Sequence, residues 1–207
     1  IAAVKRYQGS YGVTLVAQGA FSAYDTKAVK HLGGWRQGAG EDIVLTYQLL
    51  QQGRSSLYEP QAVGYTMTPG TLRDLCRQRA RWARGMFEGL AAVKPWQQPT
   101  VYGGYFESLN LSIIYLDLAY VFGFLVGVCL CLFGIHWFVG WLTLLMLPVL
   151  LISSASVYLF QKRLPAVQPK NSALGLVCFI FCFQTIQSLC SLWGYCQALT
   201  KQNIHWK

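Results

Sequence analysis

The stretch that organises this 207-residue chain is EDIVLTYQLLQQG, residues 41–53. An acidic pair opens it, apolar side chains follow at helical spacing, and Gly53 stands where a helix would end, so the pattern predicts a helix. A second cluster, RQRARW at residues 77–82, lies in a stretch that predicts a long helix over about 71–90. An acidic helix start and an arginine–tryptophan helix are therefore the two polar features to explain.

Most of the remaining chain is apolar, and the apolar residues are unevenly placed. They make up 54% of the sequence against 12% charged residues, whereas soluble domains carry about 25% charged residues. The sequence is mixed up to about Pro99 and almost continuously apolar from Leu109 onward. A bilayer core needs about 20 mostly apolar residues, so we expect about three transmembrane helices, over approximately 109–133, 139–160 and 173–199.

The charge distribution gives an expected topology. A net charge of +9 suits either nucleic acid or the anionic face of a membrane; the apolar runs favour the membrane, and we expect no nucleic-acid partner. The loop QKRLPAVQPKN, residues 161–171, is basic and predicted to be cytoplasmic, which places residues 1–100 inside. Three spans would leave the tail outside although Lys201 and Lys207 favour the inside, and this conflict stays open.

The first 100 residues predict mixed secondary structure. Residues 2–9 indicate a helix, residues 13–17 a strand, and Asp25 the N-cap of a short helix. Residues 55–69 indicate two short strands. The expected fold class is therefore α/β followed by an α-helical membrane region. Six of the seven cysteines lie inside apolar runs, which favours packing over disulfides or a metal site.

Glu41 and Asp42 allow two interpretations. Carboxylates at a helix start are favoured by the helix dipole, so the pair is explained by stability alone. The same position also stabilises a negative charge, as a general base that takes a proton from a hydroxyl requires. The residues alone leave both interpretations open.

The arginine helix is equally ambiguous. Arg77, Arg81 and Arg84 fall at helical spacing, with Gln78 and Trp82 nearby. Such a helix can lie on anionic lipid with the tryptophan as an anchor. Arginine forks also match diphosphate oxygens, and an indole face stacks on a sugar ring.

The combination resembles the processive family 2 glycosyltransferases, and within them the bacterial poly-N-acetylglucosamine synthases. The carrying segments are KRYQGSYG, QGAFSAYDTKAV, EDIVLTYQL, LYEPQAVGY, MTPGTLRDL and the Q-x-x-R-W signature Gln78-Arg79-Ala80-Arg81-Trp82. They cover nearly all of the first 110 residues, while the membrane part is similar only in hydropathy. The resemblance implies a GT-A-type domain, with its C-terminal half at 1–95, an interfacial linker at 96–108 and a membrane region at 109–207.

The resemblance also implies roles for seven residues. Asp42 would be the general base that deprotonates the acceptor hydroxyl, with Glu41 beside it. Gln78, Arg81 and Trp82 would line the place where the nucleotide diphosphate leaves and the growing sugar end sits. Gln18 and Gly19 would touch the acceptor terminus. The implied enzyme is an inverting transferase in the bacterial inner membrane, with its catalytic part cytoplasmic, which adds N-acetylglucosamine from a UDP-sugar to an exopolysaccharide.

The implied partners include a divalent cation and the lipid bilayer. The resemblance implies Mg²⁺ or Mn²⁺ held by an Asp-x-Asp sequence, and none occurs in these 207 residues. We therefore expect Ile1 to be a cut edge, with the metal ligands in a preceding half and this piece inactive alone. A small membrane partner subunit is a further expectation. The alternatives are a non-processive family 2 transferase acting on a lipid-linked acceptor, and a non-catalytic membrane subunit.

Overall fold

A computed structural model describes residues 2–136 apart from 15, 37, 60, 63 and 65, then residues 182–200, and seven isolated positions between them. The chain divides into two compact units, Ile1–Tyr115 with Cys190–Lys207 and Leu116–Leu189. The predicted span 139–160, the start of the span 173–199, the basic loop 161–171 and the tail 201–207 lie outside the described residues, isolated positions aside.

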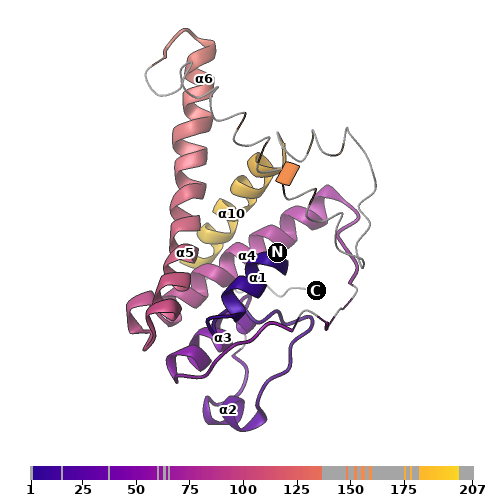
Figure 1. The fold of residues 1–207 in the computed structure, drawn as a ribbon. Coiled ribbons are helices and arrows are strands. Elements are labelled where there is room, and N and C mark those ends of the chain that lie inside the picture. The colour runs from indigo at the N-terminus through magenta and orange to yellow at the C-terminus, as the bar shows by residue number, and fades with distance from the viewer. Residues whose placement is uncertain are drawn as a thin grey trace. The chain divides into compact units, whose positions relative to one another are not determined.

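The helices expected in the first 100 residues are confirmed (Figure 1). The side chain of Asp25 accepts a hydrogen bond from the Lys27 amide at 2.9 Å, as an N-cap does. Gly53 follows the acidic helix with φ of 74°, a left-handed conformation that suits glycine. The helices of this part are α1 (Ala2–Gly9), α2 (Thr26–His31), α3 (Glu41–Gln51), α4 (Leu72–Ala92) and the 3₁₀ turn η1 (Pro95–Gln97).

The expected strands are not formed in the part of the chain that the structure describes. The segment predicted as a strand over 13–17 instead satisfies its backbone groups locally and through side chains. The Val13 amide donates to the Gln8 carbonyl oxygen at 3.3 Å, and the Ala17 amide donates to Thr46 Oγ1 at 3.0 Å. A strand needs a neighbouring ladder of backbone groups, and these bonds do not make one. The described residues therefore do not confirm the predicted α/β fold.

Helix α3 packs against α4 through glycines. A Cβ atom on Gly85 would lie 2.7 Å from the Cα of Gly40 and 2.9 Å from the Ala39 carbonyl oxygen, so backbone meets backbone. One turn later, a Cβ on Gly89 would lie 2.6 Å from Ile43 Cγ2. Only glycine permits so close an approach, and the contact fixes the acidic start of α3 on α4.

The opposite end of α3 is buried by the next helix. Helix α5 spans Val101–Leu118, and its Asn110 side chain donates to the hydroxyl of Tyr47, which is fully buried in α3. Leu90 and Val93 complete this core. The last part of α10 (Gln184–Leu199) packs on α4, where a Cβ on Gly194 would lie 3.0 Å from the Arg84 amide nitrogen.

One continuous helix among the described residues is long and apolar enough to cross a membrane. It runs over Val101–Leu132, 32 residues with a mean hydropathy of 2.2 in its most apolar window, and it contains the first predicted span. It consists of α5, the π-helical segment η2 (Ala119–Leu125) and α6 (Val126–Leu132). Length and composition are what qualify it.

Within the unit Leu116–Leu189, the one charged residue of the first predicted span is buried. Asp117 is 3% exposed, and its carboxylate accepts a hydrogen bond from Ser188 Oγ at 2.7 Å. Ser188 in turn accepts from Gln184 Nε2 at 2.9 Å. A carboxylate that is costly in an apolar setting is thereby bonded to α10.

Candidate active site

The acidic start of α3 binds a loop that lies far away in sequence. Asp42 Oδ2 accepts a hydrogen bond from the Gly19 amide at 3.2 Å, and Oδ1 accepts from the Ile43 amide at 2.9 Å. Gln18 and Gly19 are exposed and Asp42 is half-buried. Two of the predicted acceptor residues and the predicted base are therefore brought together at an accessible position.

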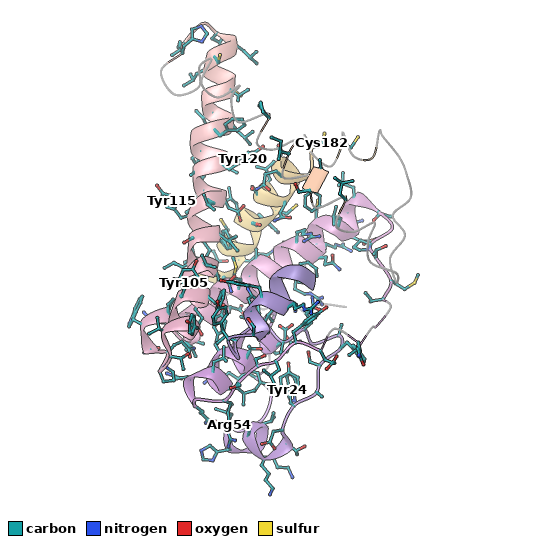
Figure 2. All side chains as sticks on the ribbon, in the orientation of Figure 1. Tyr24, Arg54, Tyr105, Tyr115, Tyr120 and Cys182 are labelled. Atoms are coloured by element: carbon teal, nitrogen blue, oxygen red, sulfur yellow. The ribbon has the colours of Figure 1, made fainter. Side chains whose placement is uncertain are left out.

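Side chains that sequence reasoning missed hold this loop in place. The Thr46 hydroxyl donates to the Asp42 carbonyl oxygen at 2.6 Å and accepts from the Ala17 amide at 3.0 Å. The Tyr24 hydroxyl donates to the Ala17 carbonyl oxygen at 3.0 Å, and Figure 2 labels this tyrosine near the base of the unit. The only signal in the sequence was the position of Thr46 one turn after Asp42.

A lysine from α1 adds positive charge beside Asp42. Lys5 Nζ donates to the Val16 carbonyl oxygen at 3.1 Å. Burial lowers the pKa of Lys5, and the negative charge of Asp42 partly offsets this by raising it. Burial and then the same charge raise the pKa of Tyr24. Asp42 therefore acts electrostatically on two groups that no short sequence motif connects to it.

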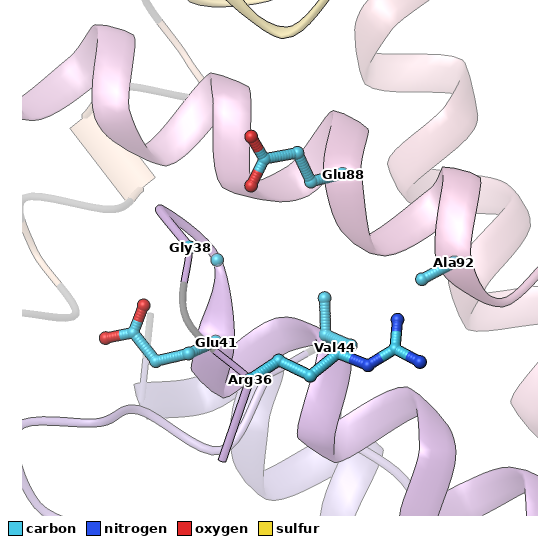
Figure 3. Close-up of a pocket in the computed structure, with 7 residues that line it drawn as sticks. Arg36, Gly38, Glu41, Val44, Glu88 and Ala92 are labelled. Atoms are coloured by element: carbon cyan, nitrogen blue, oxygen red, sulfur yellow. The ribbon is translucent and has the colours of Figure 1, made fainter. Parts of the chain in front are cut away.

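Glu41 lines a different space from Asp42. A cavity of about 140 Å³ lies where the start of α3 faces α4 (Figure 3). Figure 3 shows the side chains of Glu41, Arg36 and Glu88 around it. Glu88 accepts from Arg84 Nε at 2.6 Å, an ion pair one turn apart in α4. The residues that line the cavity are Arg36, Gly38, Gly40, Glu41, Val44, Glu88 and Ala92.

The Q-x-x-R-W residues lie on the accessible part of α4. Arg81 is exposed, Trp82 is 47% exposed, and Gln78 is half-buried. The cation that stacks on Trp82 is Arg79, whose guanidinium carbon lies 4.6 Å from the ring centroid. Burial lowers the pKa of Arg79.

The position of Trp82 on its helix relates it to the base. Gln78, Trp82, Gly85 and Gly89 recur at three- and four-residue intervals and so share one face of α4. Gly85 contacts Gly40, directly before Glu41. The side chain of Asp42 itself bonds to the Gly19 and Ile43 amides and not, within the described residues, to α4. The helix crossing, rather than a direct contact, brings the two motifs near each other.

The described residues hold no group of three His, Cys, Asp or Glu side chains that could bind a metal ion. They therefore do not provide a fit for the Mg²⁺ or Mn²⁺ that the resemblance implies.

Comparison with known families identifies the class of protein. A model of glycosyl transferase family group 2 matches residues 3–186, nearly the whole chain. The chain belongs to this family. It is a glycosyltransferase sequence in which the acidic start of α3 and the Q-x-x-R-W helix lie within the matched region.

Two relatives that the chain resembles are synthases of one polysaccharide. A poly-beta-1,6-N-acetyl-D-glucosamine synthase of Staphylococcus aureus (strain COL) is 30% identical over 127 residues, which cover 58% of this chain and 31% of the relative. The synthase of the same name from Staphylococcus epidermidis is 33% identical over 91 residues, or 44% of this chain and 22% of the relative. The chain thus spans about a third or less of the length of these relatives. No solved structure matches the chain.

Proposed function

We propose that this chain forms part of a membrane-embedded, inverting glycosyltransferase that extends an exopolysaccharide with N-acetylglucosamine from a UDP-sugar. Family membership supports the reaction class, and the names of the staphylococcal relatives support the sugar. The observation that carries the assignment of the site is the bond between Asp42 and the Gly19 amide. It joins the carboxylate to an exposed loop, which supports the proposal that an acceptor meets the base there.

The proposed reaction is a single displacement. Asp42 removes the proton from the acceptor hydroxyl, the hydroxyl oxygen attacks the anomeric carbon, and the bond from that carbon to UDP breaks. The new glycosidic bond forms on the opposite face of the sugar, so the anomeric configuration inverts. A positioned base contributes about 10²–10⁴ in rate.

The other site residues bind rather than transfer protons. Gln18 and Gly19 contact the acceptor end, while Gln78, Arg81 and Trp82 bind the departing diphosphate and the terminal sugar ring. Trp82 suits a sugar because its exposed indole face is apolar. Glu41 stands next to the base and lines the cavity with Arg36.

We further propose the organisation around the site. Residues 1–95 belong to a GT-A domain on the cytoplasmic side of a bacterial inner membrane, residues 96–108 form an interfacial linker, and 109–207 supply about three spans. The helix Val101–Leu132 supports the first span. A divalent cation would stabilise charge on the diphosphate; we assign no ligand for it among the described residues. We include a small membrane subunit as a partner, and its co-purification with the enzyme would test this.

The test is Asp42→Asn in the protein expressed from its complete reading frame. We expect polymer synthesis from radiolabelled UDP-N-acetylglucosamine in isolated membranes to be lost, while binding of the UDP-sugar is kept, because the base acts on the acceptor. Asp25→Asn is the matched control, since asparagine also caps a helix and α2 should survive. Equal loss of binding and turnover would refute Asp42 as the base.

The length of the product separates the remaining possibilities. Long chains support a processive synthase, whereas transfer of one sugar to a lipid supports the non-processive alternative. A complete protein that never turns over a UDP-sugar would support the non-catalytic subunit.

A further inference from the structure

Aromatic side chains of α1, of the turn that follows it and of α5 form a partly exposed face that the proposed reaction does not use. We call this the aromatic face. It surrounds a hollow of about 280 Å³. Tyr7 is 60% exposed and Tyr102 is 49% exposed, and no charged side chain lines the hollow. Its residues are Tyr7, Tyr11, Val101, Tyr102, Tyr105 and Phe106.

Contacts between aromatic rings hold this face together. The Tyr11 ring lies 4.3 Å from that of Tyr102 and 5.2 Å from that of Tyr7, between ring centroids. The end of α1 and the first turns of α5 are thereby joined into one surface. Figure 2 labels Tyr105 at this end of α5.

Two polar residues of the same turns of α5 are buried, whereas Ser108 between them is exposed. Glu107 is 1% exposed and Asn110 is 7% exposed. Glu107 accepts from the Gln98 side chain, and Asn110 donates to Tyr47, both within Ile1–Tyr115. Burying polar groups while presenting several aromatic rings outward is the reverse of what a water-facing surface favours, and exposed apolar patches mark interaction sites.

The length of the helix indicates what covers the face. At about 1.5 Å per residue, the 32 residues of Val101–Leu132 span about 48 Å. The hydrocarbon core is about 30 Å thick, so about a dozen residues extend beyond it. If the apolar remainder lies in the core, the first turns of α5 lie at headgroup depth, where tyrosine and tryptophan are enriched.

The residues just before α5 are of the kinds found at the membrane–water interface. Trp96 is 74% exposed, and Lys94 Nζ lies 5.4 Å from its ring centroid. Arg6, in α1 beside Tyr7, is also exposed. Cations next to aromatic rings suit anionic phosphate headgroups.

We propose that the aromatic face lies in the headgroup layer of a phospholipid bilayer, so that α1 as well as α5 rests on the membrane. This inference rests on the proposed insertion of the helix Val101–Leu132. A surface for a sugar chain or a protein is the alternative that the experiment must exclude.

The test measures lipid contact at single positions in the protein expressed from its complete reading frame. The cysteines are replaced by serine, and Tyr7→Cys, Tyr102→Cys, Met67→Cys and Leu118→Cys each carry an environment-sensitive fluorophore. The variants are reconstituted into phosphatidylethanolamine–phosphatidylglycerol vesicles with or without brominated acyl chains. Met67 is the exposed control, because it is 92% exposed and does not line the hollow, and Leu118 reports insertion of α5.

We expect bromolipids to quench the labels at positions 7, 102 and 118 but not the label at position 67. If only position 118 is quenched, the aromatic face contacts something other than lipid and this inference is wrong, while membrane insertion stands. If none is quenched, the inference and the membrane part of the proposed function both fail. Polymer synthesis by the reconstituted Tyr7→Cys and Tyr102→Cys variants shows that each of them has folded, so that misfolding cannot imitate a negative result at positions 7 and 102.

Discussion

Thr46 is a positioning residue for the proposed base, because its buried hydroxyl joins α3 to the loop that contacts Asp42. Thr46→Val keeps the shape and removes the hydroxyl, leaving the Ala17 amide without this acceptor at a cost of about 1–3 kcal/mol. We expect kcat for polymer synthesis to fall while KM for the UDP-sugar is little changed. Steady-state kinetics on purified membranes measure both.

Thr46→Ser is the matched control, since it keeps the hydroxyl and loses a methyl group. It should recover most of the lost kcat. A serine variant as slow as the valine variant would assign the effect to packing instead of the hydrogen bonds.

Arg81 and Arg79 differ in ways that their spacing in the sequence does not reveal. Arg79 is half-buried against Trp82, whereas Arg81 is exposed and available to a ligand. We expect Arg81→Ala to weaken UDP binding and to lower turnover by on the order of 10²–10³, as loss of a preorganised charge stabiliser does. Calorimetric titration with UDP checks the affinity. Arg77→Ala, at another exposed position of α4, is the control; unchanged UDP affinity in Arg81→Ala would contradict the diphosphate role.

At the scale of elements, the contact between α3 and α4 depends on Gly85. Gly85→Ala adds a methyl group 2.7 Å from the Cα of Gly40, and such overpacking costs about 1–3 kcal/mol, against a helix-propensity gain of about 1 kcal/mol. We expect a net loss of stability, read as a lower temperature of unfolding. Gly70→Ala meets nothing within 4 Å and should leave that temperature nearly unchanged. A Gly85→Ala protein as stable as its parent would show that the helices separate at little cost.

Helices were the elements that local sequence could predict. The acidic start and Gly53 delimit α3, and Thr71 caps α4 by accepting from the Asp74 amide at 3.2 Å, close to the predicted bounds. These signals act within a few residues. The predicted strand at 13–17 failed as a prediction for the described residues because alternation cannot reveal whether a neighbouring strand is available.

In the candidate site, too, some residues could be predicted from the sequence and others could not. Sequence similarity selected Asp42 and Gly19, and the structure brings them together. Their roles remain predictions. Tyr24 and Lys5 were missed because they lie 18 and 37 residues from Asp42 in sequence and act on it only after folding. Thr46 lies one turn from Asp42, but its bond to Ala17, 29 residues away, could not be foreseen. Glu41 and Asp42 looked equivalent, yet one lines the cavity and the other bonds the loop.

At the scale of the whole molecule, hydropathy predicted a span over about 109–133, which falls largely within the helix Val101–Leu132, but it did not show what the acidic residue of this span binds. Asp117 bonds to Ser188, 71 residues away. Ser188→Ala removes that donor, and we expect stability in detergent to fall by about 0.6–1.7 kcal/mol, the range for polar contacts between membrane helices. Thermal unfolding in mild detergent measures it. Ser188→Thr keeps a hydroxyl and is the control; an alanine variant as stable as the parent would make the bond incidental.

The two glycine contacts of α4 also bear on how a movement of one helix would act on the next. Gly40 meets Gly85 on one side of this helix, and Gly194 of α10 meets the backbone at Ala80 and Arg84 on another. At both junctions the atoms nearest to the glycine are backbone atoms. A displacement of the α10 segment from Cys190 onward would therefore press directly on the backbone of α4, the helix whose Gly85 contacts Gly40 at the start of α3. A force on that segment would thus act on the helix that carries Gln78, Arg81 and Trp82.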